Sequence, residues 1–242
     1  MWNGRTVAVI LPTYRERSSI AACIKGFEAL GIVDDLVVIN NNAEPGTSAE
    51  VATTTAREVF ETTQGYGAAI QRGLREVDAD LICVCEPDAT FDPADLSKLL
   101  PYSAECDAVF GSRTVSTFIW SGANMNWFLR WGNWAVAKLI EVLFNTPYLS
   151  DVGCTYRVLT RECVRRIQPE FRSNGSRFGL EMQLLVVAAG DRFVQVPVNY
   201  HPRVGESAVT GDFGKAVGLG LDMIRLVVVT RSRRARIRAR VS

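Results

Sequence analysis

Two acidic side chains, Glu86 and Asp88, stand one residue apart at the point where a buried run of apolar residues ends. In an extended segment, carboxylates at this spacing repel each other unless a cation lies beside them. A hard divalent cation prefers oxygen ligands and commonly keeps phosphate oxygens in its coordination shell. The position of the pair at a strand end therefore predicts a metal site for a phosphate-bearing substrate. A solvated acidic turn is the simpler alternative for the pair taken alone.

Two further polar clusters follow apolar runs in the same way, at residues 12–16 (Pro-Thr-Tyr-Arg-Glu) and 40–44 (Asn-Asn-Asn-Ala-Glu). Ligands of parallel sheets bind at the carboxyl ends of the strands. Residues 65–67 (Gly-Tyr-Gly) also open a helix, where glycines permit close approach and the helix N-terminus favours an anion. The three clusters together predict a nucleotide site in the first hundred residues.

Three arginines and two carboxylates in the second half of the chain are further candidates for chemistry. Arg113, Arg130 and Arg203 are candidates for phosphate, because a guanidinium can bind phosphate through two parallel hydrogen bonds. Asp151 and Glu181 are candidate general bases, although a carboxylate at a helix start can simply complement the helix dipole. Spacing alone does not show whether these side chains converge.

Alternating apolar runs and amphipathic segments predict the elements that position these residues. In the first half we expect strands at 6–11, 35–40 and 80–85 and helices at 18–30, 48–57 and 68–77. This alternation is typical of right-handed βαβ units and a parallel sheet. In the second half we expect strands at 107–111, 156–159 and 193–200, helices at 126–144 and 180–189, and an amphipathic segment at 213–229.

The composition is that of a globular protein, with 242 residues, 48% hydrophobic and 22% charged. Net charge is only +1, but six arginines lie between residues 231 and 240, and without them 21 basic residues (27 less these six) face 26 acidic ones. An acidic body argues against nucleic acid as the main ligand. The basic tail is suited to an anionic membrane surface.

The six cysteines are scattered, and the single histidine excludes His-based zinc chemistry. No secretory signal precedes the first strand, so we expect a cytoplasmic protein with reduced thiols. No run of about 18 apolar residues is present.

Taken together, these segments resemble the family 2 glycosyltransferases, and in particular the polyprenyl-phosphate (dolichyl-phosphate) hexose synthases. Residues 12–16 are similar to the family's P-x-Y-N-E loop, 41–47 to its D-[DN]-x-S-x-D-G-T segment, 65–69 to its G-[KY]-G-A-A segment and 86–88 to its D-x-D metal motif. Later blocks of the family are matched, in order, at residues 111–113, 151–157, 181 and 203–207. The resemblance runs from about residue 6 to about residue 210.

The resemblance implies a GT-A fold, an α/β architecture with a mixed, mostly parallel sheet flanked by helices. It implies a single domain at 1–210, with a donor half at about 1–112 and an acceptor half at about 113–210, followed by an amphipathic segment and basic tail at 211–242. The activity implied is inverting transfer of a hexose from a GDP- or UDP-sugar to a polyprenyl phosphate, with Mg²⁺ or Mn²⁺.

The same resemblance assigns roles to the candidate residues. Glu86 and Asp88 hold the metal, and Arg113 and Arg130 hold the acceptor phosphate. The donor is held by Pro12, Tyr14, Glu16, Asn41, Gly67, Glu86 and Arg203. The catalytic set is Asp88, Asp151 and Glu181.

Two departures from the family pattern keep alternatives open. Glu86 replaces the first aspartate of the metal motif, and Asn41 replaces an acid of the donor segment. A polyprenyl phosphate is already an anion and needs no general base, whereas a hydroxyl acceptor needs one. The alternatives are therefore a soluble hydroxyl acceptor and a nucleotide-sugar-binding relative with weak catalysis. We also expect peripheral membrane association through residues 213–229 and the arginine tail.

Overall fold

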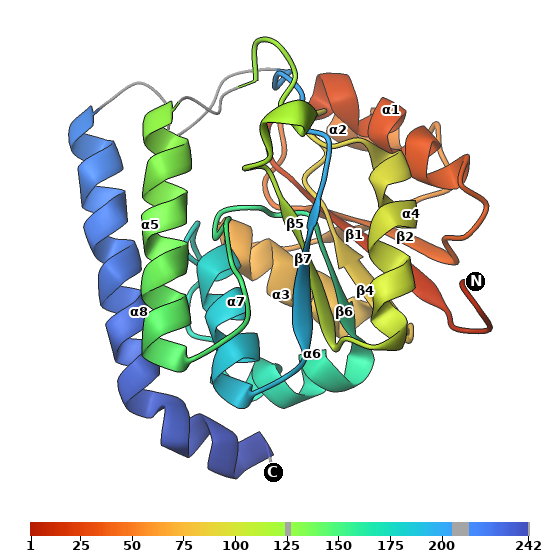
Figure 1. Cartoon of the computed structure of the whole chain (residues 1–242). Helices are drawn as coiled ribbons and strands as arrows, with labels where there is room; N and C mark the ends of the chain where they lie inside the picture. Colours follow the sequence, from red (N-terminus) through yellow and green to blue (C-terminus); the bar gives the residue numbers. More distant parts are fainter. Residues whose placement is uncertain (124–126, 205–212, 242) are drawn as a thin grey trace.

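A single seven-stranded sheet forms the centre of the molecule (Figure 1). The computed structural model describes residues 1–123, 127–204 and 213–241. The strands follow the order β3-β2-β1-β4-β6-β5-β7 across the sheet. Their bounds are β1 (Val7–Thr13), β2 (Asp35–Asn40), β3 (Arg57–Phe60), β4 (Leu81–Val84), β5 (Ala108–Ser112), β6 (Arg157–Thr160) and β7 (Phe193–Pro197).

Only β6 runs against its neighbours among the described strands, pairing antiparallel with both β4 and β5. All other neighbouring strands are parallel. The carboxyl ends of the six parallel strands therefore lie at one edge of the sheet, where the polar clusters were expected. The predicted mixed, mostly parallel sheet is confirmed.

Helices cover both faces of the sheet (Figure 1). Their bounds are α1 (Arg17–Glu28), α2 (Thr47–Val51), α3 (Tyr66–Glu76), α4 (Leu96–Leu99), α5 (Trp127–Phe144), α6 (Arg161–Ile167), α7 (Phe178–Ala189) and α8 (Phe213–Val241). Strand β1 shows how the faces are filled, because its side chains alternate between them. Val7, Val9 and Leu11 belong to the core with α1 and α4, whereas Ala8 and Ile10 belong to the core with α3 and α7.

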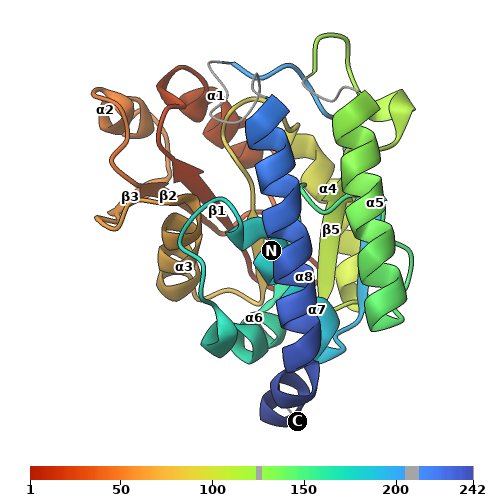
Figure 2. The ribbon, with the colours of Figure 1, turned by 90° about the vertical axis from the view of Figure 1, so that its left-hand side faces the viewer.

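Helices α5 and α8 lie side by side in an outer layer beyond α7 (Figures 1 and 2). The amphipathic stretch and the arginine-rich stretch form one continuous helix, since α8 runs from Phe213 to Val241. Val227 and Ile237 are fully buried against the domain. No helix within the described ranges is both long enough and apolar enough to cross a membrane.

Two predicted elements were wrong in their extent, and the strand expected at 193–200 ends at Pro197. The helix expected at 48–57 ends at Val51, and Arg57–Phe60 is instead the edge strand β3. The hydroxyls of Thr53 and Thr54 bond back to the carbonyls of Glu50 and Val51 and end the helix. The domain boundary expected at 210–211 lies outside the described residues.

Candidate active site

Asp88 lies in a tight turn just beyond the carboxyl end of β4. Its side chain is buried, and Oδ1 accepts hydrogen bonds from the Thr90 amide at 3.0 Å and the Thr90 hydroxyl at 2.5 Å. Ala89 between them has a φ of 64°, in the left-handed region that an alanine rarely adopts. The bonds from Thr90 stabilise this strained turn and fix the direction of the Asp88 carboxylate.

Helix α1 is joined to the same turn. The hydroxyl of Ser19, in the first turn of α1, donates to the carbonyl of Pro87 at 2.6 Å. The helix predicted at 18–30 begins at Arg17, and its cap position is Glu16. Ser19 therefore links the turn at Asp88 to the loop that precedes α1.

Glu16 organises that loop, which follows β1. Its Oε2 atom accepts from the Thr13 hydroxyl at 3.1 Å and from the amides of Tyr14 and Arg15 at 2.6 and 2.8 Å. Pro12, the first residue of the predicted donor loop, is buried in β1, whereas the Tyr14 ring is exposed beside the site. Glu16 thus fixes a loop that presents an aromatic side chain to solvent.

Arg203 bridges these two acidic groups. Its Nη2 atom lies 3.2 Å from Glu16 Oε1, and its Nε atom lies 3.3 Å from Asp88 Oδ2. The surrounding backbone is held to the Asp88 turn, because the Val204 amide donates to the Asp88 carbonyl and the His201 amide to the Thr90 carbonyl. Residues 205–207 of the same predicted block lie outside the described residues.

Glu86 is half-buried beside this cluster. The pKa of Glu86 is raised from 4.5 to about 7, chiefly by burial and then by the negative charges of Asp88 and Glu16, while the charges of Arg203 and Arg113 oppose the rise. The electrostatic influence of all four groups shows that residues from four distant parts of the chain converge here. The accumulated negative charge is the property that a bound cation would neutralise.

The donor set at this point fits Mg²⁺ or Mn²⁺. Glu86 and Asp88 offer carboxylate oxygens, the ligands that such hard cations prefer. Over residues 1–123, 127–204 and 213–241, no group of three or more His, Cys, Asp and Glu side chains is placed to hold a metal. Binding of a divalent cation by Glu86 and Asp88 stays a prediction.

Asn41 is buried and already has partners for its whole side chain. Its Nδ2 donates to the carbonyls of Glu61 and Thr63 at 2.9 and 2.8 Å, and its Oδ1 accepts from the Gly65 amide at 2.7 Å. In this arrangement Asn41 ties the loop after β3 to the end of β2. Contact with a donor nucleoside stays a prediction for this residue.

The glycines at the start of α3 are approached closely by the chain itself. A Cβ on Gly67 would lie 2.5 Å from the Ser173 carbonyl oxygen and 2.6 Å from the Cβ of Phe178. The Ala68 amide, in the first turn of α3, donates to the Asn174 carbonyl. The close packing of residues 173–174 therefore explains why residue 67 is a glycine. The predicted contact of Gly67 with the donor stays a prediction.

Arg113 and Asp151 form a buried pair next to the acidic cluster. The carboxylate accepts from Nε, Nη2 and the backbone amide of Arg113, each at 2.9 Å, and from the Gly153 amide at the same distance. Although burial alone would raise it, the charge and hydrogen bonds of Arg113 hold the pKa of Asp151 below its usual range. The guanidinium also lies 5.3 Å from the ring of Tyr200, which precedes Arg203 by three residues.

The two remaining predicted residues have different surroundings. Glu181, in the first turn of α7, is buried and accepts from the amides of Arg172 and Ser173 at 3.3 and 2.8 Å. It thereby holds the same segment that packs on Gly67. Arg130 lies in the first turn of α5 with an exposed side chain.

The family model named "Glycosyl transferase family 2" matches residues 8–167. The chain belongs to this family. The expected activity class, a nucleotide-sugar-dependent hexosyltransferase, is confirmed.

Two named relatives of this family 2 glycosyltransferase cover almost the same length. An uncharacterized glycosyltransferase of Mycobacterium tuberculosis is 28% identical over 93% of this chain and 99% of its own length. The undecaprenyl-phosphate mannosyltransferase of Micrococcus luteus is 27% identical over 87% of this chain and 90% of its own.

Solved structures support the fold. Glucosyl-3-phosphoglycerate synthase from Mycobacterium tuberculosis, in complex with Mn²⁺ and UDP-glucose, superposes with a TM-score of 0.73 at 17% identity. The match covers 95% of this chain and 80% of that one. The predicted GT-A fold is thus confirmed.

Two features of this family 2 glycosyltransferase were not expected from the sequence. Thr90 holds Asp88 from two positions away, and a hydroxyl residue at that spacing in a turn is a signal that could have been used. Arg157 of β6 is fully buried, with its guanidinium on the carbonyls of Gly179 and Cys154. The sequence around Arg157 contains no sign of that burial.

Proposed function

We propose that this enzyme transfers a hexose, with inversion, from a nucleoside-diphosphate sugar to a polyprenyl phosphate. The donor is a GDP- or UDP-hexose, and the acceptor phosphate oxygen attacks the anomeric carbon as the nucleoside diphosphate leaves. The related undecaprenyl-phosphate mannosyltransferase and the dolichyl-phosphate hexose transferase of Haloferax volcanii, 26% identical, support this acceptor class.

The observation that carries the proposal is the state of the two candidate bases. Asp151 accepts four hydrogen bonds from Arg113 and Gly153, and Glu181 is buried on the amides of Arg172 and Ser173. Because its four hydrogen bonds engage both carboxylate oxygens, Asp151 is poorly placed to remove a proton from a hydroxyl acceptor, whereas the two amides bonded to Glu181 engage its Oε2 atom. An acceptor that is already an anion needs charge positioning instead, which Arg113 and Arg130 would supply.

The remaining residues have roles at the donor. Tyr14 and the loop fixed by Glu16 would hold the nucleoside, and Glu86 and Asp88 would hold Mg²⁺ or Mn²⁺. When bound, the cation stabilises the negative charge that develops on the departing diphosphate. Arg203 lies beside the same position and would contact the donor phosphates.

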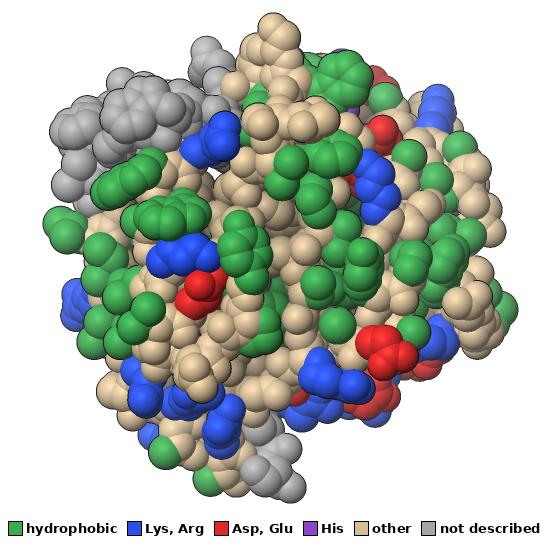
Figure 3. Space-filling model, viewed as in Figure 1, with side chains coloured by type: hydrophobic (Ala, Val, Ile, Leu, Met, Phe, Trp, Pro, Cys, Tyr) green, Lys and Arg blue, Asp and Glu red, His purple; other side chains and the backbone are tan. Residues whose placement is uncertain are grey.

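An exposed apolar ridge on α5 and α8 supports an acceptor that resides in a membrane. The ridge comprises Trp131, Trp134, Leu221, Ile224 and Val228, all of which are exposed. On α8 its residues are spaced by three and four positions and so share one face. Hydrophobic side chains gather over this part of the molecule in Figure 3. Aromatic and aliphatic groups of this kind insert at the lipid headgroup boundary.

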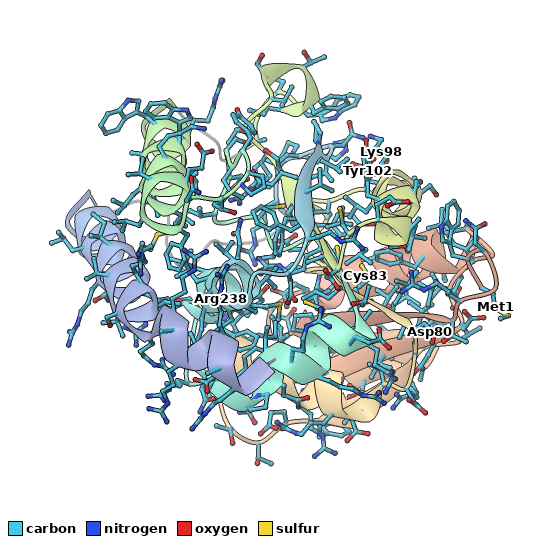
Figure 4. All side chains as sticks on the ribbon, turned by 60° about the horizontal axis from the view of Figure 1, so that its bottom comes forward. Met1, Asp80, Cys83, Lys98, Tyr102 and Arg238 are labelled. Carbon is cyan, nitrogen blue, oxygen red and sulfur yellow. The ribbon has the colours of Figure 1, made fainter. Side chains whose placement is uncertain are left out.

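Several arginines of the tail are bonded to the rest of the protein, so the tail offers less unpaired positive charge to a membrane than its sequence indicates. Arg233 and Arg240 are bonded to the buried carboxylate of Glu170, and Arg231 donates to the Leu143 carbonyl. Arg238 donates from Nε to the carbonyl of Ala188 on α7 (Figure 4). Exposed arginines along α8, such as Arg225 and Arg236, would accompany the apolar ridge at an anionic lipid surface.

A donor screen with a short polyprenyl phosphate and Mg²⁺ or Mn²⁺ tests this function. We expect one GDP- or UDP-hexose to yield a lipid-phosphate sugar, detected by mass spectrometry, and chelation of the metal to abolish it. Asp88→Asn should reduce transfer by roughly a hundredfold or more, whereas Asp92→Asn, which keeps an acceptor for the Ala94 amide, should not. Binding of nucleotide without transfer from any donor would instead favour a catalytically weak relative.

A further inference from the structure

The acidic cluster already contains a cation, the guanidinium of Arg203. It lies between Glu16 and Asp88, at 3.2 Å from one carboxylate and 3.3 Å from the other. Both carboxylate side chains are largely buried, at 11% and 2% exposure, and Glu86 stands beside them. Charges in such surroundings are screened little by solvent, so these short distances carry a strong interaction.

The charge balance shows why this arginine is needed. Glu16, Glu86 and Asp88 bring three carboxyl groups together, and the charge of nearby Arg113 is paired with Asp151. Within the part of the chain that the structure describes, Arg203 contacts two of the three directly. Carboxylates brought together in this way repel each other unless a positive charge separates them.

The backbone around Arg203 is fixed while the side chain has room to move. The amides of His201 and Val204 are bonded to the carbonyls of Thr90 and Asp88. The arginine side chain itself is 26% exposed, so one side of it faces solvent. A change of side-chain rotamer can therefore withdraw the guanidinium without breaking the turn at Asp88.

We propose that Arg203 is a resident counter-ion that keeps the divalent cation from binding until a nucleoside diphosphate arrives. It bridges Glu16 and Asp88 in the free protein; when the metal and the diphosphate bind together, the guanidinium leaves Asp88 and pairs with phosphate. The inference rests on the proposed metal-dependent function and adds an order of binding to it. By linkage, metal and nucleotide then strengthen each other's binding by the same factor.

The test measures binding of Mn²⁺ without any turnover, by isothermal titration and by the electron paramagnetic resonance signal of free Mn²⁺. Wild type should bind Mn²⁺ weakly alone and much more tightly with GDP or UDP. Arg203→Gln should bind Mn²⁺ alone roughly tenfold or more tightly than wild type does, because a competing positive charge is removed. The gain from added nucleotide should shrink in this variant.

Two further variants separate charge from structure. Arg203→Lys keeps the charge and should retain weak binding of Mn²⁺ alone. Arg192→Gln removes a charge at the opposite edge of the sheet, next to Asp107, and should behave as wild type. Thermal melting of each variant checks that it is folded.

The outcomes distinguish this inference from the function on which it rests. If wild type binds Mn²⁺ with a nucleoside diphosphate but Arg203→Gln gains no affinity for Mn²⁺ alone, the counter-ion role is overturned and the metal site stands. If no protein binds Mn²⁺ even with GDP or UDP, the metal site is overturned and the counter-ion role with it.

Discussion

Asp88, Glu16 and Asp151 accept hydrogen bonds from close neighbours, and those neighbours define what each carboxylate can do. Thr90 directs Asp88, and the loop amides direct Glu16. The guanidinium of Arg113 donates to both oxygens of Asp151, so the two side chains hold each other in place. At the residue scale, therefore, we propose that Asp151 holds the Arg113 side chain in position. We also propose that the acceptor is already negatively charged and needs no general base.

Replacement of Asp151 by Asn tests that support. The Arg113–Asp151 side chains are 14% and 0% exposed, and loss of one member leaves a buried charge without its partner. We expect the free energy of unfolding, measured by urea denaturation, to fall by about 3 kcal/mol. Asp78→Asn, which breaks an ion pair with Arg161 at a 95% exposed aspartate, should change it by less than about 1 kcal/mol. Equal stability of the two variants would show that the buried pair is unimportant.

At the scale of elements, the start of α3 and the segment at 173–174 are built around each other. Gly67 allows the Ser173 carbonyl to approach, the Ala68 amide bonds to Asn174, and Glu181 holds the segment from the α7 side. A pattern that resembled a phosphate-binding entry thus has a packing explanation in this fold.

Gly67→Ala should destabilise the protein because its Cβ would meet backbone and side-chain atoms at 2.5–2.6 Å. We expect a loss of about 2 kcal/mol, seen as a lower melting temperature by calorimetry. Gly132→Ala is the matched control, since its Cβ would meet no atom within 4 Å in helix α5 and should stabilise the helix by up to about 1 kcal/mol. If the two variants had the same melting temperature, the close approach at Gly67 would not contribute to stability.

The elements could be predicted from sequence where burial imposes a pattern. The strands β1, β2 and β4 are short apolar runs, and their predicted bounds agree with the structure within two residues. Strand β3 was missed because Arg57 and Glu58 carry charge and the strand is defined by pairing with β2. The bridge from Arg203 to Glu16 joins residues 187 positions apart, and only the folded chain brings them together.

Helix α8 is held to the domain through Glu170. Its buried carboxylate accepts from Arg233 and Arg240 at 2.5 Å each. Burial alone would raise the pKa of Glu170, but the hydrogen bond and charge of Arg240, with Arg233, lower it below 4.5. The contribution of this contact to stability is therefore complete above the ordinary glutamate pKa and is lost as the pH falls through the lowered value.

Glu170→Gln should loosen the end of α8 at neutral pH. We expect faster hydrogen exchange in the last turns of α8, by roughly tenfold, and little change in the strands. The wild type should approach the variant's exchange pattern, after correction for the intrinsic rate, only when the pH falls below 4.5. Glu162→Gln, at an exposed glutamate, should leave the exchange of α8 unchanged. If Glu170→Gln left the rate of hydrogen exchange in α8 unchanged, the proposed attachment of this helix would be contradicted.

At the scale of the whole molecule, the ridge on α5 and α8 is the surface we propose to face the lipid (Figures 2 and 3). Combined replacement of Trp131 by Ala and Leu221 by Ser should reduce binding to anionic liposomes at low salt by roughly tenfold or more. Phe60→Ser, at an equally exposed residue on the edge strand β3, should bind as wild type does. Failure of the wild type to bind such liposomes would exclude this surface as a membrane contact.

A competition between two acceptors in one reaction tests most directly whether the acceptor is a polyprenyl phosphate. The enzyme, its donor sugar nucleotide and Mn²⁺ are mixed with equal amounts of a polyprenyl phosphate and the polyprenol of the same chain length, and the products are counted by mass spectrometry. We expect the sugar to appear on the phosphate alone, because the phosphate is already an anion and both oxygens of the Asp151 carboxylate are bonded to Arg113 and Gly153. Sugar on the alcohol, at a level comparable to the phosphate, would contradict it.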